Sequence, residues 1–293
     1  MKAIIFDIQR SSYVDGPGIR TTVFMKGCHL HCAWCHNPES QAGGIQRMWY
    51  DSKCTHCGNC AKKCPAGAIT FDPDTGALSC DKEKCTLCGR CELFCPADAI
   101  AICGKWEDTD SLVSVIKKDK PFYDSTGGGV TVSGGECMLH PDFVAELLQK
   151  CKAEGIHTAV DTAGDVPFES FEKVLPHTDL FLYDIKCVTP DLHKKFTGID
   201  NARLIENYKR LLAMGKDVIV RVPMIVECSA NDGEFPKIAA FLKENPPRKA
   251  ELLPYHAMGE NKHRALGYGE QTLFTAPDET AMNRYKAMIV ELL

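Results

Sequence analysis

Short apolar runs alternate with amphipathic segments along most of this chain, which is the pattern of repeated strand and helix units. Six runs are rich in β-branched residues and bounded by turn residues, as buried strands are. These predicted strands cover residues 21–25, 130–133, 157–161, 180–184, 218–222 and 250–254. The predicted helices cover residues 110–118, 141–154, 168–175, 202–214, 233–244 and 277–292. Pro141 in a first turn and Gly155 just past a last turn support these boundaries.

Repeated strand–helix units favour an α/β fold with a parallel sheet and right-handed crossovers. Six units predict a partial (β/α)6 barrel, two units short of the eightfold form. An open doubly wound sheet is the alternative. A cysteine-rich segment interrupts the alternation, so we expect the barrel to comprise residues 1–49 and 106–293, with residues 50–105 as an insert.

Composition narrows the possible partners. The 293 residues carry a formal net charge of −5, so no basic field draws the chain to nucleic acid. No apolar run reaches the roughly 18 residues that a membrane span needs. Residues 1–7 lack the basic and long apolar regions of a signal peptide, so we expect a cytoplasmic protein.

Cysteine is the unusual residue, because 11 of the 17 cysteines fall in three runs. In a reducing compartment such clustering indicates metal binding rather than disulfides. The first run is C-x3-C-x2-C and the other two are C-x2-C-x2-C-x3-C. In chain order the runs are Cys28, Cys32 and Cys35; Cys54, Cys57, Cys60 and Cys64; and Cys85, Cys88, Cys91 and Cys95.

The two four-cysteine runs form an internal repeat in which proline follows the last cysteine. This is the bacterial ferredoxin spacing, in which the fourth cysteine of each run ligates the cluster of the other run. One [4Fe–4S] cluster is therefore predicted on Cys54, Cys57, Cys60 and Cys95, and a second on Cys64, Cys85, Cys88 and Cys91. Two zinc sites are the alternative, although zinc runs are usually separated C-x2-C pairs. Cys80 and Cys103 flank the last run and could replace one of these ligands.

The first run has only three cysteines, which can hold three irons of a four-iron cluster and leave one iron open to a substrate, as in catalytic zinc sites. In barrels of parallel strands, functional residues gather at the carboxyl ends of the strands. Polar or metal-binding residues follow each predicted strand, so we expect them on one rim. They are Lys26–Cys28, Ser133–Glu136, Asp161 and Thr162, Asp184–Lys186, Arg221, and Tyr255 and His256.

The first cysteine run followed by Gly134-Gly135-Glu136 resembles the radical S-adenosylmethionine enzymes. Six further segments look like the glycyl-radical-enzyme activating enzymes of that superfamily, and the resemblance runs from about residue 4 to about residue 270. The segments are DGPGIR at 15–20, KGC at 26–28, WCHNPE at 34–39, GGGVT at 127–131, DIK at 184–186 and LPYH at 253–256.

The resemblance implies that S-adenosylmethionine chelates the open iron and is cleaved to a 5′-deoxyadenosyl radical. That radical would abstract a Cα hydrogen from one glycine of a partner glycyl radical enzyme. The family positions expected to touch the cofactor are matched by Trp34, Cys35, His36, Gly135, Asp184, Ile185, Lys186 and His256. Asp161 and Thr162 match positions that help to hold a monovalent cation in pyruvate formate-lyase activase.

The resemblance also implies three [4Fe–4S] clusters, of which the two auxiliary ones relay electrons from a flavodoxin or ferredoxin or help to dock the partner enzyme. Two other functions remain open at this point. A non-catalytic electron carrier would need only the eight ferredoxin cysteines and not Cys28, Cys32 and Cys35. A radical S-adenosylmethionine enzyme acting on a small molecule is disfavoured by the resemblance of residues 15–20.

Overall fold

An eight-stranded mixed sheet forms the centre of the computed structural model, which describes residues 1–270 and 272–293. The strand order is β12-β11-β10-β9-β8-β2-β1-β7. All pairings from β12 to β2 are parallel, whereas β1 is antiparallel to both of its neighbours. The strands are β1 (Lys2–Ser12), β2 (Arg20–Met25), β7 (Lys105–Asp108), β8 (Gly129–Gly134), β9 (His157–Thr162), β10 (Leu180–Asp184), β11 (Val218–Met224) and β12 (Lys249–Pro254).

The six predicted strands are confirmed as β2 and β8 to β12. The parallel strands follow one another in a single direction across the sheet, without the reversal of strand order that defines a doubly wound fold. The partial barrel is therefore the correct prediction and the open doubly wound sheet is wrong. Two strands at one edge, β1 and β7, were not predicted. In β1 buried Ala3 and Ile5 alternate with more exposed residues, so no continuous apolar run marks it.

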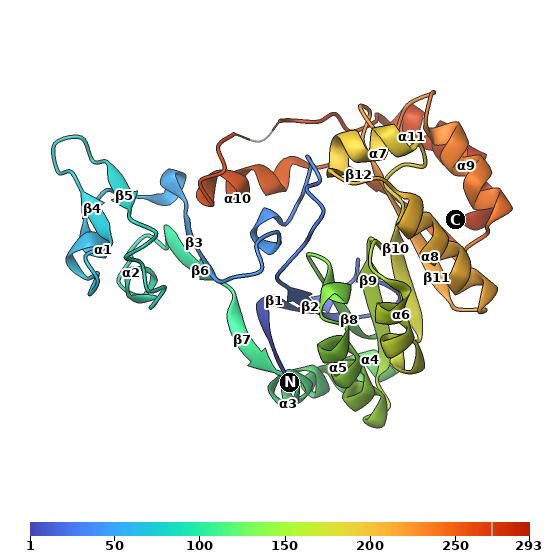
Figure 1. The fold of residues 1–293 in the computed structure, drawn as a ribbon, viewed down its shortest axis with the longest axis horizontal. Helices are drawn as coiled ribbons and strands as arrows, with labels where there is room; N and C mark the ends of the chain where they lie inside the picture. The colour runs from blue at the N-terminus through green and yellow to red at the C-terminus, as the bar shows by residue number, and fades with distance from the viewer. Residues whose placement is uncertain (271) are drawn as a thin grey trace.

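The helices that follow the parallel strands cover the outer face of the sheet, as Figure 1 shows for α5, α6, α8 and α9. Their aliphatic and aromatic side chains pack with those of the strands in one large core. Asp108 caps α3 and Asp278 caps α11, each accepting a backbone N–H bond from the first turn. The helices outside the cysteine-rich segment are α3 (Thr109–Ile116), α4 (Lys120–Thr126), α5 (Pro141–Ala153), α6 (Phe168–Val174), α7 (Pro190–Thr197), α8 (Ala202–Ala213), α9 (Phe235–Glu244), α10 (Glu260–Ala265) and α11 (Glu279–Met288). Of these, α4, α7 and α10 were not predicted.

The cysteine-rich segment projects to one side of the barrel (Figure 1). Strand β3 (Gln46–Trp49) pairs with β6 (Ile100–Cys103), which brings the two ends of the segment together, and β4 (Ile69–Phe71) pairs with β5 (Leu78–Cys80). Two one-turn helices, α1 (Asn59–Lys62) and α2 (Arg90–Leu93), pack against each other. A small core contains buried Cys60, Ile69, Cys91 and Ile100.

The two halves of this segment repeat the same local geometry. Gly58 and Gly89 precede α1 and α2 with φ of 69° and 76°, a left-handed conformation that favours glycine. The backbone N–H of Ala68 donates to Cys64 Sγ at 3.3 Å, and that of Ala99 donates to Cys95 Sγ at 3.2 Å. The sequence repeat is therefore also a structural repeat. Over the described residues, no helix is long and apolar enough to cross a membrane.

Candidate active site

The first cysteine run lies on the loop that leaves the carboxyl end of β2. Backbone hydrogen bonds hold both ends of this loop, from Gly27 N to Ser40 O at 2.7 Å and from Cys28 N to Gln41 O at 3.0 Å. Farther along, His31 N donates to Thr197 O at 2.8 Å, at the end of α7. The loop is thus fixed to the barrel rim at several points, as a cluster-binding loop has to be.

The structure brings the three thiols of this loop together at the rim. Electrostatic interaction couples Cys28, Cys32 and Cys35 to one another, and the Lys186 ammonium acts on all three. Burial raises the pKa of Cys28 and of Cys32 to about 12 and also raises the pKa of Cys35. Burial therefore disfavours the thiolate form of all three groups, and a bound metal would have to displace their protons.

Three thiols are the donor set that a four-iron cluster with one open iron needs. Among residues 1–270 and 272–293, no three His, Cys, Asp or Glu side chains lie close enough together to hold one metal ion. The thiolates of a [4Fe–4S] cluster bind different irons at separate corners and do not have to meet at one point. All 17 cysteines are free, so none of the predicted ligands is lost to a disulfide.

A buried ion pair lies beside the thiols at the end of β10. Lys186 Nζ is 2.7 Å from Asp184 Oδ2, and the lysine side chain is almost fully buried. Burial, the largest single effect, lowers the pKa of this ammonium, but the Asp184 carboxylate together with the neighbouring cysteines outweighs it and raises the pKa of Lys186. Ile185 between them is also buried, and its N–H donates to Arg221 O at 2.9 Å. The site thus keeps one fixed positive charge next to Cys32.

Two histidines from opposite ends of the chain meet over the cysteine loop. The His36 and His256 rings stack with centroids 3.8 Å apart. Burial, assisted by His256, lowers the pKa of His36 to about 4, so the ring is neutral at physiological pH. His36 Nε2 is buried and has no hydrogen-bond partner among the described residues, which suits contact with a bound molecule. Trp34 is buried between the rings of Phe196 and Phe274, each with its centroid 5.8 Å away.

Gly135 forms a close contact between the end of β8 and the cysteine loop. A Cβ at this position would overlap the Gly27 carbonyl and lie 3.0 Å from Cys28 Cβ. The adjacent Glu136 N–H donates to Gly27 O at 2.8 Å. The Glu136 carboxylate is buried, which raises its pKa, and it accepts a hydrogen bond from Thr162 Oγ1 at 2.7 Å. Gly135 and Glu136 therefore set the position of the loop that carries Cys28.

Asp161 and Thr162 end β9 on the same rim, and protein groups already contact both. Asp161 Oδ2 accepts a hydrogen bond from Ser133 Oγ at 2.7 Å and lies 3.3 Å from Arg221 Nη1. Burial raises the pKa of Asp161 to about 6. Thr162 Oγ1 donates to Glu136 and accepts from Gly164 N at 2.9 Å. A cation at Asp161 would therefore share the carboxylate with Arg221.

Asp15 and Arg20 fix the loop between β1 and β2. The Arg20 guanidinium is fully buried and donates to Thr131 Oγ1 at 2.7 Å and to Val130 O at 2.6 Å. Asp15 accepts from Thr22 Oγ1 at 2.7 Å. Both side chains form hydrogen bonds with other residues of the barrel, so their observed contacts stabilise the fold.

One contact at the site has no signal in the sequence. Lys262 in α10 donates to Glu39 Oε1 at 2.5 Å and to Asn37 Oδ1 at 2.9 Å, although the residues lie more than 220 positions apart. Just before α10, a Cβ on Gly259 would lie 2.5 Å from the Cys35 carbonyl oxygen. The segment after β12 thus packs directly on the cysteine loop. The WCHNPE motif revealed Asn37 and Glu39, but nothing in the sequence pointed to Lys262.

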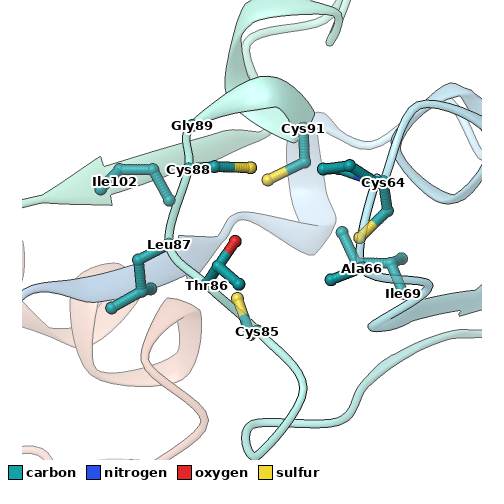
Figure 2. Close-up of a pocket in the computed structure, with 11 residues that line it drawn as sticks. Cys64, Ala66, Ile69, Cys85, Thr86, Leu87, Cys88, Gly89, Cys91 and Ile102 are labelled. Carbon is teal, nitrogen blue, oxygen red and sulfur yellow. The ribbon is translucent and has the colours of Figure 1, made fainter.

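A small cavity in the projecting segment is lined by cysteines of both four-cysteine runs. Figure 2 shows the sulfur atoms of Cys64, Cys85, Cys88 and Cys91 turned toward the same space. This combination, one cysteine from the first run with three from the second, is the set predicted for one cluster. The other residues that line the cavity are largely apolar, including Ala66, Leu87 and Ile102.

The two extra cysteines near this cavity differ in position. Cys80 does not line it, although its thiol lies near Cys85, and burial raises its pKa. Cys103 is buried in a separate apolar group with Met48, Ala265 and Leu266. In the other predicted set, Cys60 interacts electrostatically with Cys54 and Cys57. Its fourth member, Cys95, follows α2.

Comparison with known proteins agrees with these features. The Radical SAM superfamily profile matches residues 83–242, and a 4Fe-4S dicluster domain profile matches residues 53–99. The chain is 44% identical to the trans-4-hydroxy-L-proline dehydratase activating enzyme of Clostridioides difficile, over 90% of this chain and 87% of that protein. It is 39% identical to the choline trimethylamine-lyase activating enzyme of Oleidesulfovibrio alaskensis, over 91% and 88% of the two chains.

Among solved structures, Streptococcus suis SuiB bound to S-adenosylmethionine is similar in fold, with a TM-score of 0.51 and 15% identity over 63% of this chain and 40% of that chain. The two activating enzymes are similar over nearly their whole length. Together with the partial barrel, the three-cysteine loop and the repeated four-cysteine runs, these similarities show that the chain belongs to the glycyl-radical-enzyme activating enzymes of the radical SAM superfamily.

Proposed function

We propose that Cys28, Cys32 and Cys35 hold the catalytic [4Fe–4S] cluster of an activase that acts on a glycyl radical enzyme. When bound, the cluster and S-adenosylmethionine supply the reductive C–S cleavage whose 5′-deoxyadenosyl radical takes a glycine Cα hydrogen from the partner. The observation that carries this proposal is the placing of three partly buried thiols beside the Asp184–Lys186 pair at the carboxyl ends of the barrel strands.

The surrounding residues supply charge and shape for the cofactor. The Lys186 ammonium beside Cys32 offers a positive charge to a carboxylate, and Asp184 holds it in place. The stacked rings of His36 and His256 offer a flat surface, and His36 Nε2 is an unpaired ring nitrogen. Gly135 keeps the backbone of β8 close to the loop. Trp34 is buried, so we expect its backbone rather than its indole to contact the cofactor, as we do for Cys35 and Ile185.

We also propose that Asp161 and Thr162 help to hold a monovalent cation near the cofactor. The Asp161 carboxylate would supply the negative charge for this cation, and it also pairs with Arg221, whose Nη1 lies 3.3 Å from Asp161 Oδ2. Replacing K⁺ with tetramethylammonium should then weaken S-adenosylmethionine binding by about tenfold, a usual coupling between two sites. Isothermal titration in the two salts measures this change. Equal affinities would show that Arg221 alone balances Asp161 and that no cation is needed.

The two four-cysteine runs are proposed to hold two auxiliary [4Fe–4S] clusters in residues 50–105, which would make three clusters in all. Replacing a ligand of the cavity in Figure 2, Cys88→Ala, should disturb one auxiliary cluster and slow reduction of the protein. The matched control is Cys80→Ala, which removes a neighbouring thiol that does not line the cavity. Iron analysis and reduction kinetics of both variants check the assignment. Iron loss in Cys80→Ala equal to that in Cys88→Ala would place Cys80 among the ligands.

A flavodoxin or ferredoxin is the proposed electron donor. The proposed location is the cytoplasm, a reducing compartment in which free thiols persist, and all 17 cysteines are free thiols.

The test of the whole function is electron paramagnetic resonance after anaerobic incubation with S-adenosylmethionine, reductant and a glycyl radical enzyme. The partners of the two similar activating enzymes, trans-4-hydroxy-L-proline dehydratase and choline trimethylamine-lyase, are the first to try. A glycyl radical doublet is expected. Cofactor cleavage coupled instead to a modified metabolite would favour action on a small molecule.

A further inference from the structure

A surface that combines basic and apolar side chains lies where α1 and α2 pack together in the projecting segment. This basic–aromatic patch consists of Lys62, Lys63, Arg90, Leu93 and Phe94. Leu93 is 77% exposed and Phe94 is 40% exposed. Both helices belong to the internal repeat, so the patch is formed by equivalent ends of the two halves.

The patch is organised around one aromatic ring. Lys63 Nζ lies 5.3 Å from the centroid of the Phe94 ring, and the Arg90 guanidinium carbon lies 5.8 Å from it. Cation–π contacts of this kind hold two positive charges beside an exposed apolar surface. Aromatic and arginine side chains are enriched in the centres of protein interfaces. The composition of the patch is therefore that of a protein-binding surface.

The patch is adjacent in sequence to the predicted cluster ligands. Lys63 immediately precedes Cys64, and Phe94 immediately precedes Cys95. Cys60 and Cys91 lie within the two helices and are buried. The four cysteines are divided between the two proposed auxiliary clusters. A redox protein bound here would thus approach both clusters closely, and electron tunnelling depends steeply on that distance.

The charge of the patch selects the kind of partner. Three of its five residues are basic, and Glu92 is the one acidic residue of α2. The chain as a whole carries −5, so this is a local field of opposite sign to the net charge. Complementary charge steers association and raises the rate of encounter. An acidic surface is therefore the one that fits.

We propose that the basic–aromatic patch is the docking site for a small acidic one-electron donor protein of the flavodoxin or ferredoxin type. This inference rests on the proposed function, because it requires the auxiliary clusters. In the step itself, the reduced donor loses one electron and a [4Fe–4S] cluster of residues 50–105 gains it, with no bond formed or broken. Phe94 and Leu93 would contact an apolar area near the donor's redox centre, and the basic side chains would pair with its carboxylates.

The test uses the fully reconstituted protein and reduced flavodoxin. The variant Lys63→Glu/Arg90→Glu reverses the charge of the patch without removing a cysteine. The matched control, Lys2→Glu/Lys286→Glu, makes the same change in net charge at exposed positions on the barrel. Iron analysis confirms that each variant carries the wild-type cluster content. A neutral pair, Lys63→Gln/Arg90→Gln, replaces the reversed pair if the latter loses iron.

Stopped-flow absorbance then follows cluster reduction by flavodoxin and, separately, by dithionite. We expect the patch variant to be reduced by flavodoxin at least about tenfold more slowly than wild type at low salt. Its dithionite-driven formation of 5′-deoxyadenosine should remain normal. The control variant should match wild type, and added salt should slow only wild type and control. Wild-type rates with flavodoxin in the patch variant would overturn the docking site. Absence of 5′-deoxyadenosine with dithionite in the wild type would instead reject the proposed function.

Discussion

Cys32→Ala should reduce 5′-deoxyadenosine formation to background, the largest effect expected of any single substitution. Cys32 lies on the loop after β2 beside Lys186, so its loss removes one of three thiolates from the catalytic cluster. A four-iron cluster held by two cysteines is not expected to persist. Iron content should fall from about twelve to about eight atoms per chain, because the two auxiliary clusters have their own ligands. Iron analysis and product chromatography under dithionite measure both quantities.

The matched control for this substitution is Cys151→Ala. Cys151 is fully buried in α5 within the main core and distant in sequence from every cysteine run. The same chemical change there should leave iron content and cofactor cleavage intact, with a modest loss of stability. Normal product formation by Cys32→Ala would show that the three-cysteine loop is not the catalytic site.

Gly135→Ala should lower cofactor cleavage by about a hundredfold, since displacement of a reacting group by about 1 Å can cost that much. The new methyl group would overlap the Gly27 carbonyl and press on Cys28 Cβ. Its neighbours are the Gly27 carbonyl and the Cβ of Cys28, which is fixed to the loop backbone, so no flexible end of a side chain can yield. The loop that carries Cys28 has to move instead, and both cluster loading and cofactor positioning should suffer. The ratio of 5′-deoxyadenosine formed to iron bound measures the effect.

Gly44→Ala, on the loop that carries Cys28, is the control for Gly135→Ala. A Cβ on Gly44 would meet nothing within 4 Å, so the substitution changes glycine to alanine without a clash. We expect wild-type activity from it. Equal losses in the two variants would mean that general stiffening of the loop, rather than the contact between Gly135 and Gly27, explains the effect.

The local features of this protein were predictable from sequence because each depends on neighbouring residues. The parallel strands are buried on both faces and therefore appear as continuous apolar runs. The cysteine spacings are local as well, and Figure 2 shows one predicted set, Cys64, Cys85, Cys88 and Cys91, lining one cavity. Strand β1 was missed because it is half exposed and alternates apolar with polar residues. Helix α10 is only 6 residues long, too short for a clear helical period.

Long-range contacts at the site could not be predicted from sequence. The pairing of Lys262 with Glu39 and the stacking of His36 on His256 join segments more than 200 residues apart. The sharing of Asp161 between Ser133 and Arg221 likewise depends on how three separate strands are ordered in the sheet. Such contacts follow from topology, so they became visible only once the fold was known.

The most direct test of the account is anaerobic reconstitution with iron and sulfide, followed by iron counting and a dithionite-driven assay for 5′-deoxyadenosine. About twelve irons per chain together with cleavage of S-adenosylmethionine is the predicted result, because it requires three [4Fe–4S] clusters of which one is catalytic. About eight irons without cleavage would contradict the account. It would leave a two-cluster electron carrier and remove the catalytic role from Cys28, Cys32 and Cys35.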